Sequence, residues 1–323
     1  PVSGLYLYCA MRGALIVCIV MLVGTVGCAQ QLSQYTQYVF NQFSINPAVA
    51  GSKDCLDVRL GFRQQWVGLP GAPTTGWASL HASLKGKNKP FQNNKHGIGM
   101  FVEADQAGNW GYTRFLLAYA YHIQMSKDYY MALGVFAGVQ QMKFDVGEAF
   151  LSDAGDPALD GKATSLVVPD ISPGIWVYGK RFWGGLALQQ ALGNKIKNIG
   201  TSSKLARHFK LSAGYRFKLG TKMSFTPSTM FKVAEGSPVA LDVNAMIEWN
   251  RVIALGIGYR NGDALTLMMK VGFLQFFQLG YSYDVTTSRL REGSSNTHEI
   301  ILGVTPCSKA GKDKRMINCP AFD

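Results

Sequence analysis

The chain has few charged side chains and few segments long enough to cross a membrane as a helix. Of its 323 residues, 16% are charged and 47% are hydrophobic. An intrinsically disordered chain has the opposite balance, with low hydrophobicity and high charge. A membrane protein built from several helices needs several apolar runs of about 20 residues, and a single such run lies near the N-terminus. Both classes are therefore excluded.

The sequence also lacks the spacings of common catalytic and metal sites. None of the five histidines forms an HExxH pair, and no GxSxG motif is present. Residues 155–162 resemble a phosphate-binding loop only loosely, and Ala163 stands where that motif needs Ser or Thr. We therefore expect no enzymatic activity and no catalytic, cofactor or metal site. An enzyme using His208 or His298 is the weaker alternative.

Residues 1–29 read as a leader. Within them, Arg12 precedes an apolar core at 14–23, and small residues at 27–29 suit a cleavage site, which is the order of a secretory signal peptide. We expect cleavage after residue 29, with residues 1–10 as an upstream extension. Lipoprotein processing at Cys28 and a retained anchoring helix are the alternatives.

Three cysteines follow the leader, namely Cys55, Cys307 and Cys319. Three thiols allow at most one internal bridge. Cys307 and Cys319 are close in sequence, and a secreted chain meets oxidising conditions, so we predict a disulfide between them. They lie in a basic tail at 306–323, and the whole chain has a net charge of +12. Because a secreted protein rarely meets nucleic acid, this charge favours acidic protein partners or anionic lipids.

From residue 54 onward, polar and apolar residues alternate with a period of two, which is typical of strands with one polar and one apolar face. Most of these segments have roughly 10–14 residues, near the ~9–11 that cross a bilayer as a tilted strand. The fourteen predicted strands are 54–66, 74–85, 95–104, 110–123, 128–142, 172–180, 181–190, 205–218, 222–233, 238–249, 251–260, 263–273, 274–286 and 297–305.

The fold class predicted for residues 54–305 is therefore all-β, a transmembrane antiparallel outer-membrane β-barrel of about 14 strands. Charges on the polar face must point into the lumen, since an Arg or Lys facing lipid at midplane costs roughly 2–4 kcal/mol. Internal ion pairs in a filled barrel are favoured over an open pore. A soluble β-sandwich or lipocalin-like barrel is the alternative fold. The candidate lumenal charges are Arg59, Arg114, Lys210, Arg216, Asp242, Glu248, Lys270 and Asp284.

The predicted connections alternate between short and long. Long ones on one side fall at 143–171, 191–204 and 287–296, and very short ones lie on the other side. One connection on the short side breaks this rule, because 85–95 is long, polar and basic. Outer-membrane barrels have short periplasmic turns and longer extracellular loops. Both ends of the barrel chain, and the tail at 306–323, are therefore expected in the periplasm.

The segment 30–53 precedes the first strand. Leu32, Tyr35, Val39 and Phe43 are spaced three to four apart, which predicts a short amphipathic helix. Pro47 would end it. We expect this segment at the barrel mouth, either as a simple cover or as a plug or docking element.

Two blocks of residues resemble the PorP/SprF family. The first lies in the segment 30–53, and the second spans the end of the predicted strand 54–66 and the turn after it, at 63–68 and 71–74. The resemblance extends over essentially the whole chain after the leader. The residues that carry it, which become candidate partner-docking or structural positions, are Gln37, Tyr38, Asn41, Asn46, Pro47, Ala48, Gly51, Arg63, Trp66 and Gly68.

The resemblance implies an outer-membrane component of the type IX secretion system of Bacteroidota, with a role in gliding motility for some members. Such a protein would support export or surface anchoring of cargo with C-terminal sorting domains. Its implied partners are outer-membrane lipid, the periplasmic ring, peptidoglycan-linked secretion components, and the cargo or adhesin itself. The alternative function is a passive or substrate-specific outer-membrane channel of the porin kind.

Overall fold

The computed structural model describes residues 32–53, 55–85, 94–145, 164–196, 204–274, 276–294 and 296–306. The predicted leader, Cys307, Cys319 and the rest of the tail lie outside these residues. The described elements are η1 (Gln42–Ser44), η2 (Pro47–Val49), β1 (Asp57–Gln64), β2 (Thr74–Lys85), β3 (Lys95–Ala107), β4 (Trp110–Gln124), β5 (Tyr129–Phe144), β6 (Thr164–Gly179), β7 (Phe182–Gln189), β8 (His208–Tyr215), β9 (Phe217–Leu219), β10 (Met223–Ala234), β11 (Ala240–Trp249), β12 (Ile253–Arg260), β13 (Ala264–Phe273), β14 (Phe277–Thr286), η3 (Arg289–Glu292) and β15 (Thr297–Val304).

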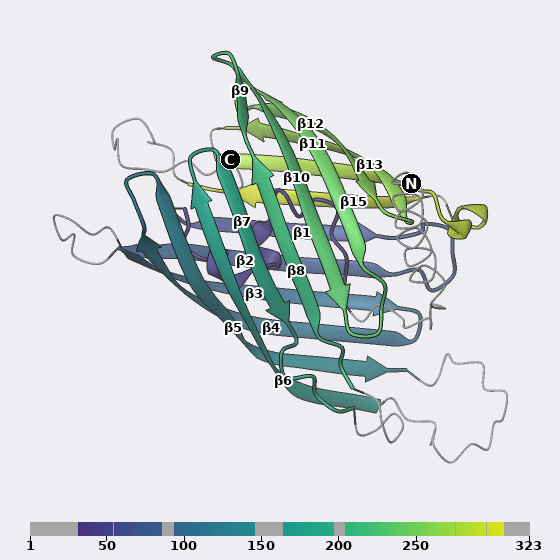
Figure 1. The fold of residues 1–323 in the computed structure, drawn as a ribbon. Coiled ribbons are helices and arrows are strands. Elements are labelled where there is room, and N and C mark those ends of the chain that lie inside the picture. Colours follow the sequence, from purple (N-terminus) through teal and green to yellow (C-terminus); the bar gives the residue numbers. More distant parts are fainter. Residues whose placement is uncertain are drawn as a thin grey trace, which may run out of the picture.

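The strands form one closed antiparallel barrel (Figure 1). Each strand pairs with its neighbours in sequence, and β1 pairs with β15 to close the sheet. Strands β8 and β9 both pair with β10 and are separated by Arg216 alone, so they act as one strand. Counted in this way the barrel has 14 strands, which confirms the predicted fold class and strand number.

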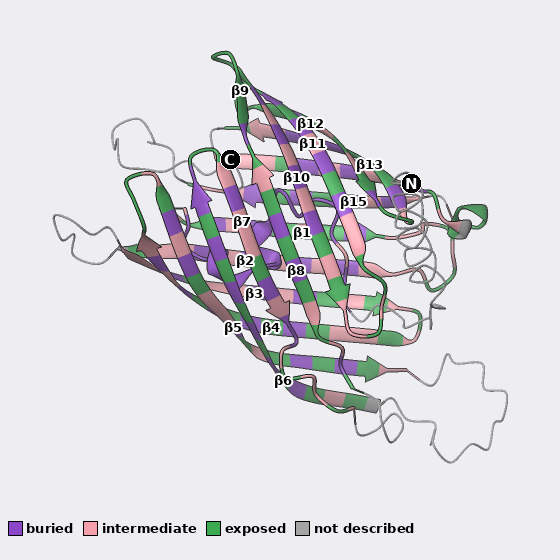
Figure 2. Cartoon of the chain, in the orientation of Figure 1, coloured by how far each residue is buried: buried purple, intermediate pink, exposed green. Residues whose placement is uncertain are grey.

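Burial is reversed relative to a water-soluble protein, with polar side chains inside and large apolar side chains outside. Buried and exposed residues alternate along the strands (Figure 2). Ile257 is 64% exposed on the outer face, whereas Arg63 is 1% exposed in the lumen. No open strand edge is tolerated in hydrocarbon, so closure and an apolar outer face belong together. No helix in the described part of the chain is long and apolar enough to span a membrane.

Strand β6 begins at Thr164, eight positions before the predicted start at residue 172, so the predicted loop 143–171 was too long. Pro169 and Pro173 weaken the strand pattern, because proline cannot donate to a sheet ladder. They are tolerated because β7 pairs with β6 only from Gly174 onward. The first half of β6 pairs along its length with β5 alone.

Five connections at one end of the barrel are short, at 125–128, 180–181, 220–222, 250–252 and 274–276. The longer connection predicted at 85–95 joins β2 and β3 at the same end and lies largely outside the described residues. We call this the short-turn end. The connections 65–73, 145–163, 190–207 and 287–296 lie at the other, long-loop end. Strand β1 starts and β15 finishes at the short-turn end, as predicted from the alternation of loop lengths.

Candidate functional site

The N-terminal segment 32–52, which we call the plug, lies inside the barrel and runs along the lumen. At the long-loop end, Ser33 N–H donates to the Tyr112 hydroxyl at 2.8 Å, and Ser33 Oγ donates to Asp105 at 2.8 Å. At the short-turn end, Lys95 Nζ donates to the Ser52 carbonyl at 2.6 Å. The plug therefore extends from one end of the lumen to the other, where a position at the mouth had been expected.

The predicted amphipathic helix at the plug is wrong. The described plug contains only the short 3-10 helices η1 and η2, in an otherwise irregular chain. Leu32, Tyr35, Val39 and Phe43 are all buried, as predicted from their apolar character. An amphipathic helix needs one polar face toward water, but the barrel wall surrounds the plug and takes side chains on every side.

An ion-pair cluster around Arg63 holds the plug to the wall. Arg63 on β1 bonds Asp284 on β14 at 3.0 Å and Glu299 on β15 at 2.9 Å. It also donates to Thr36 Oγ1 in the plug at 2.7 Å, and Arg260 on β12 donates to the same oxygen at 3.0 Å. The Thr36 N–H donates to Glu299 at 2.8 Å. Four strands and the plug therefore share one buried network.

A second cluster lies on the neighbouring part of the wall. Arg114 on β4 bonds Glu103 on β3 at 3.2 Å and Asp170 on β6 at 3.0 Å. The Tyr35 hydroxyl of the plug donates to Glu103. All four side chains are buried. The positive charge of Arg114 is compensated within the wall, because a carboxylate lies on each side of its guanidinium. The plug adds a neutral donor, the Tyr35 hydroxyl.

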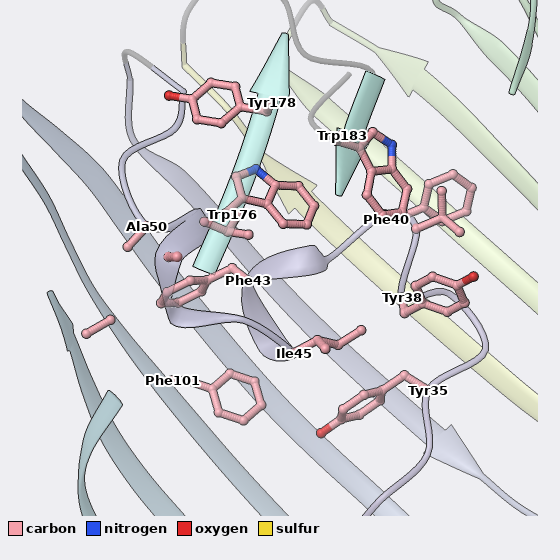
Figure 3. Packing of buried hydrophobic residues seen from close by; sticks show 14 of the residues in the cluster. Tyr35, Tyr38, Phe40, Phe43, Ile45, Ala50, Phe101, Trp176, Tyr178 and Trp183 are labelled. Atoms are coloured by element: carbon pink, nitrogen blue, oxygen red, sulfur yellow. The ribbon is translucent and has the colours of Figure 1, made fainter. Parts of the chain in front are cut away.

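Aromatic contacts and glycines shape the lumen around the plug (Figure 3). Phe43 packs against Phe136 on β5, with ring centroids 5.2 Å apart. A Cβ added at Gly134 on β5 would lie 2.5 Å from the Cα of Ala48, and one at Gly97 would overlap the Ala50 carbonyl. These inward glycines therefore leave room for the plug backbone.

Asn46 fixes the middle of the plug. Its Oδ1 accepts the N–H of Ala48 at 3.0 Å and so caps η2, which begins at Pro47. Its Nδ2 donates to the Ile175 carbonyl of β6 at 2.8 Å. The Asn-Pro pair therefore starts a 3-10 turn here, rather than ending a helix. Pro is well suited to the first helical position, where its missing N–H is not needed.

The structure brings together eight of the ten family-like positions. Gln37, whose Nε2 donates to the Glu299 carbonyl at 2.8 Å, lies in the lumen with Arg63. Trp66 and Gly68 lie apart, in the connection after β1 at the long-loop end. The buried lumenal members of the set are Gln37, Tyr38, Asn41, Asn46, Pro47, Ala48, Gly51 and Arg63.

All eight predicted lumenal charges are buried. Asp284 and Arg114 belong to the clusters above. Arg59 bonds Asp57 at 2.7 Å near the short-turn end. Lys270 and Arg216 both approach Glu248, at 3.1 Å and 3.7 Å.

Asp242 and Lys210 have contrasting surroundings. Asp242 on β11 bonds Lys232 at 2.8 Å and Arg260 at 3.5 Å. Lys210 on β8 faces the lumen beside Lys232, its partner in the strand register. It forms no ion pair with any carboxylate among the described residues.

Sequence reasoning did not single out Thr36, Glu103, Asp170 or Glu299. Glu299 lies two positions from Thr297 and Ile301, which are also buried, so the alternation in 297–305 does mark it as inward. Glu103 follows from the alternation in 95–104 in the same way. No local pattern marks Thr36, because its partners are far away in the sequence.

Two connections at the long-loop end are tied together. Lys204, before β8, bonds Glu235, after β10, at 3.2 Å. This hydrogen bond lowers the pKa of the Glu235 carboxyl, and nearby Arg207 acts in the same direction. Leu205 packs against Met142 and Val168 inside the rim. Residues 204–207 therefore close part of this end.

Cys55, just before β1, is disulfide-bonded. Its partner lies outside the described residues, as do Cys307 and Cys319, and the predicted bridge between those two stays a prediction. Among the described residues, no group of three or more His, Cys, Asp or Glu side chains is placed to hold a metal.

A family model described as type IX secretion system membrane protein PorP/SprF matches residues 27–304. No curated protein matches the chain. Among solved structures, the toluene transporter TbuX of Ralstonia pickettii is similar, with a TM-score of 0.50 and 9% identity over 81% of this chain and 92% of that one. A FadL homologue of Pseudomonas aeruginosa has a TM-score of 0.47 and 8% identity over 85% and 94% of the two chains. At these identities the likeness concerns the barrel fold alone.

Proposed function

Since the chain belongs to the PorP/SprF family of type IX secretion system membrane proteins, we propose that it supports export or surface anchoring of cargo with C-terminal sorting domains. It is an outer-membrane β-barrel component of that system and interacts with the secretion machinery. We propose that it acts through protein–protein contacts, with no catalytic step of its own, and that gliding adhesins are among its cargo.

The single observation that carries this proposal, beside the family, is the filled lumen. The plug crosses the whole barrel and is bonded to the wall at both ends and at the Arg63 cluster. The described residues of the plug occupy the lumen along its length, where a polypeptide or a large solute would have to pass. The barrel is therefore better suited to binding other proteins through its surfaces than to conducting solutes.

The short-turn end supplies a surface for a periplasmic partner. Its described turns and the adjoining strand ends carry six exposed basic side chains, against the single acid Asp128 in these turns. Complementary charge speeds encounter and sets orientation. We propose that this end meets acidic surfaces of the periplasmic ring or of peptidoglycan-linked components. The basic residues are Lys127, Lys180, Arg181, Lys218, Lys222 and Arg251.

The test is a comparison of surface and secreted proteins between a deletion strain and its parent. We expect selective loss of proteins with a C-terminal sorting domain, and recovery when the wild-type gene is restored. A variant with the six basic turn residues changed to Gln should fold and reach the outer membrane, but fail to restore secretion. An unchanged secretome in the deletion strain would contradict the proposal.

The channel alternative has its own measurement. Purified barrel in a planar bilayer should show little steady conductance while the plug is in place. Stable conductance by the wild-type barrel, together with an unchanged secretome, would establish the channel function instead.

A further inference from the structure

A cavity of about 70 Å³ lies in the lumen near the long-loop end, between the start of the plug and the wall. Leu32, Ile45 and Met230 form an apolar side. Ser237 and Pro238, in the β10–β11 connection, also line it, so the cavity reaches the rim of the barrel. Its volume matches a small organic group or about two water molecules.

The opposite side of the cavity is basic. His208, Lys210 and Lys232 line it from the neighbouring strands β8 and β10. Lys210 and Lys232 are directly opposite each other in the strand register. Two like charges in this position destabilise a sheet unless an anion lies near both.

One described carboxylate is directly bonded to this pair of lysines. Asp242 bonds Lys232 at 2.8 Å. Lys210 is 8% exposed and has no ion-pair or hydrogen-bond partner among the described residues. His208 Nε2, which is also buried, has no hydrogen-bond partner there either. A buried ammonium group without a directly bonded anion is costly, so an anion that enters the cavity would be stabilised beside Lys210.

We propose that this cavity binds the carboxylate of a small organic acid. Lys210 would contact the carboxylate oxygens, with Lys232 beside it. The apolar body of the acid would then lie against Leu32, Ile45 and Met230. A carboxylate on an apolar body matches both sides of the cavity, whereas inorganic phosphate would turn oxygens toward apolar side chains.

This site is separate from the secretion role. Its lining residues belong neither to the Arg63 cluster nor to the short-turn end, although Asp242 links Lys232 to Arg260 of that cluster, and the cavity is open toward the long-loop end. The ligand would also touch the plug, because Leu32 and Ile45 belong to it. Binding would therefore hold the start of the plug against β8 and β10.

The experiment is calorimetric titration of the purified full-length barrel, in an uncharged detergent, with butyrate, butyramide and inorganic phosphate. We expect saturable binding of one butyrate per barrel, with butyramide and phosphate each at least tenfold weaker. Absence of saturable butyrate binding would overturn the proposal. Equal binding of butyramide would show that charge is not recognised, and tighter binding of phosphate would refute the carboxylate assignment.

Variants then locate the site. Lys210→Met should weaken butyrate binding at least tenfold, and Lys210→Arg should retain it. Lys143→Met removes the same charge from an exposed site on β5, outside both the cavity and the short-turn end, and should bind like the wild type. Heat-modifiable migration shows whether each variant folds. Unchanged binding by folded Lys210→Met would overturn the proposal, and the three ligands tested on wild-type protein keep it falsifiable if that variant does not fold.

Discussion

Replacing Gly134 by valine tests whether close contact with the barrel wall keeps the plug in place. A Cβ at this position would lie 2.5 Å from both the Cα and the N of Ala48. Since carbon atoms in contact are normally about 3.5–4.0 Å apart, the plug must move by about 1 Å. Valine is a good strand residue, so the barrel itself should remain intact.

The expected effect follows from the cost of overpacking, which is typically ~1–3 kcal/mol. If this cost falls on the plug, the displaced plug becomes roughly five- to 150-fold more populated. The N–H groups of Val49 and Ala50, bonded to the carbonyls of Asn46 and Pro47, report on this. Their hydrogen exchange should become faster by that factor.

Gly76→Val is the matched control. Gly76 lies in β2 on the outer face, where an added Cβ meets nothing within 4 Å. It makes the same change without touching the plug, so exchange at Val49 and Ala50 should stay at the wild-type rate. Equal protection of the plug from hydrogen exchange in Gly134→Val and Gly76→Val would refute the idea that contact with the wall holds the plug in place.

Three further changes test other parts of the structure. Ile257→Arg places a charge toward lipid, at roughly 2–4 kcal/mol near the midplane, and should reduce the folded band in heat-modifiable electrophoresis; normal migration would contradict the assigned outer face. Arg63→Met leaves the carboxylates of Asp284 and Glu299 buried without their partner, and should lower the free energy of unfolding by about 3–5 kcal/mol. An unchanged urea midpoint would show that the cluster contributes little. Cys55 should resist alkylation until the protein is reduced, and rapid labelling without reductant would exclude its disulfide.

The sequence by itself determined the barrel and the orientation of its strands. In 251–260, the alternation places Ile257 outward and Arg260 inward, as the structure has them. This pattern is local, because neighbouring side chains in a strand point to opposite faces. Lipid then decides which face is outside, since unpaired charges are excluded from it. The alternation did not predict the first half of β6, because proline usually interrupts a strand and Pro169 and Pro173 lie there. Only the structure shows that this half pairs with β5 and not with β7, which leaves an edge where proline is tolerated.

The tertiary structure alone decided the path of the plug and the partners of the lumenal charges. Thr36 donates to Glu299, 263 positions later in the chain, and no periodicity links the two. The spacing of Leu32 and Phe43 predicts a helix only if one side of the segment meets water. Inside the barrel every side meets the wall, so contacts with distant strands replace the regular hydrogen bonds of a helix. The position of Lys210 beside Lys232 likewise became visible only from the register in which β8 pairs with β10.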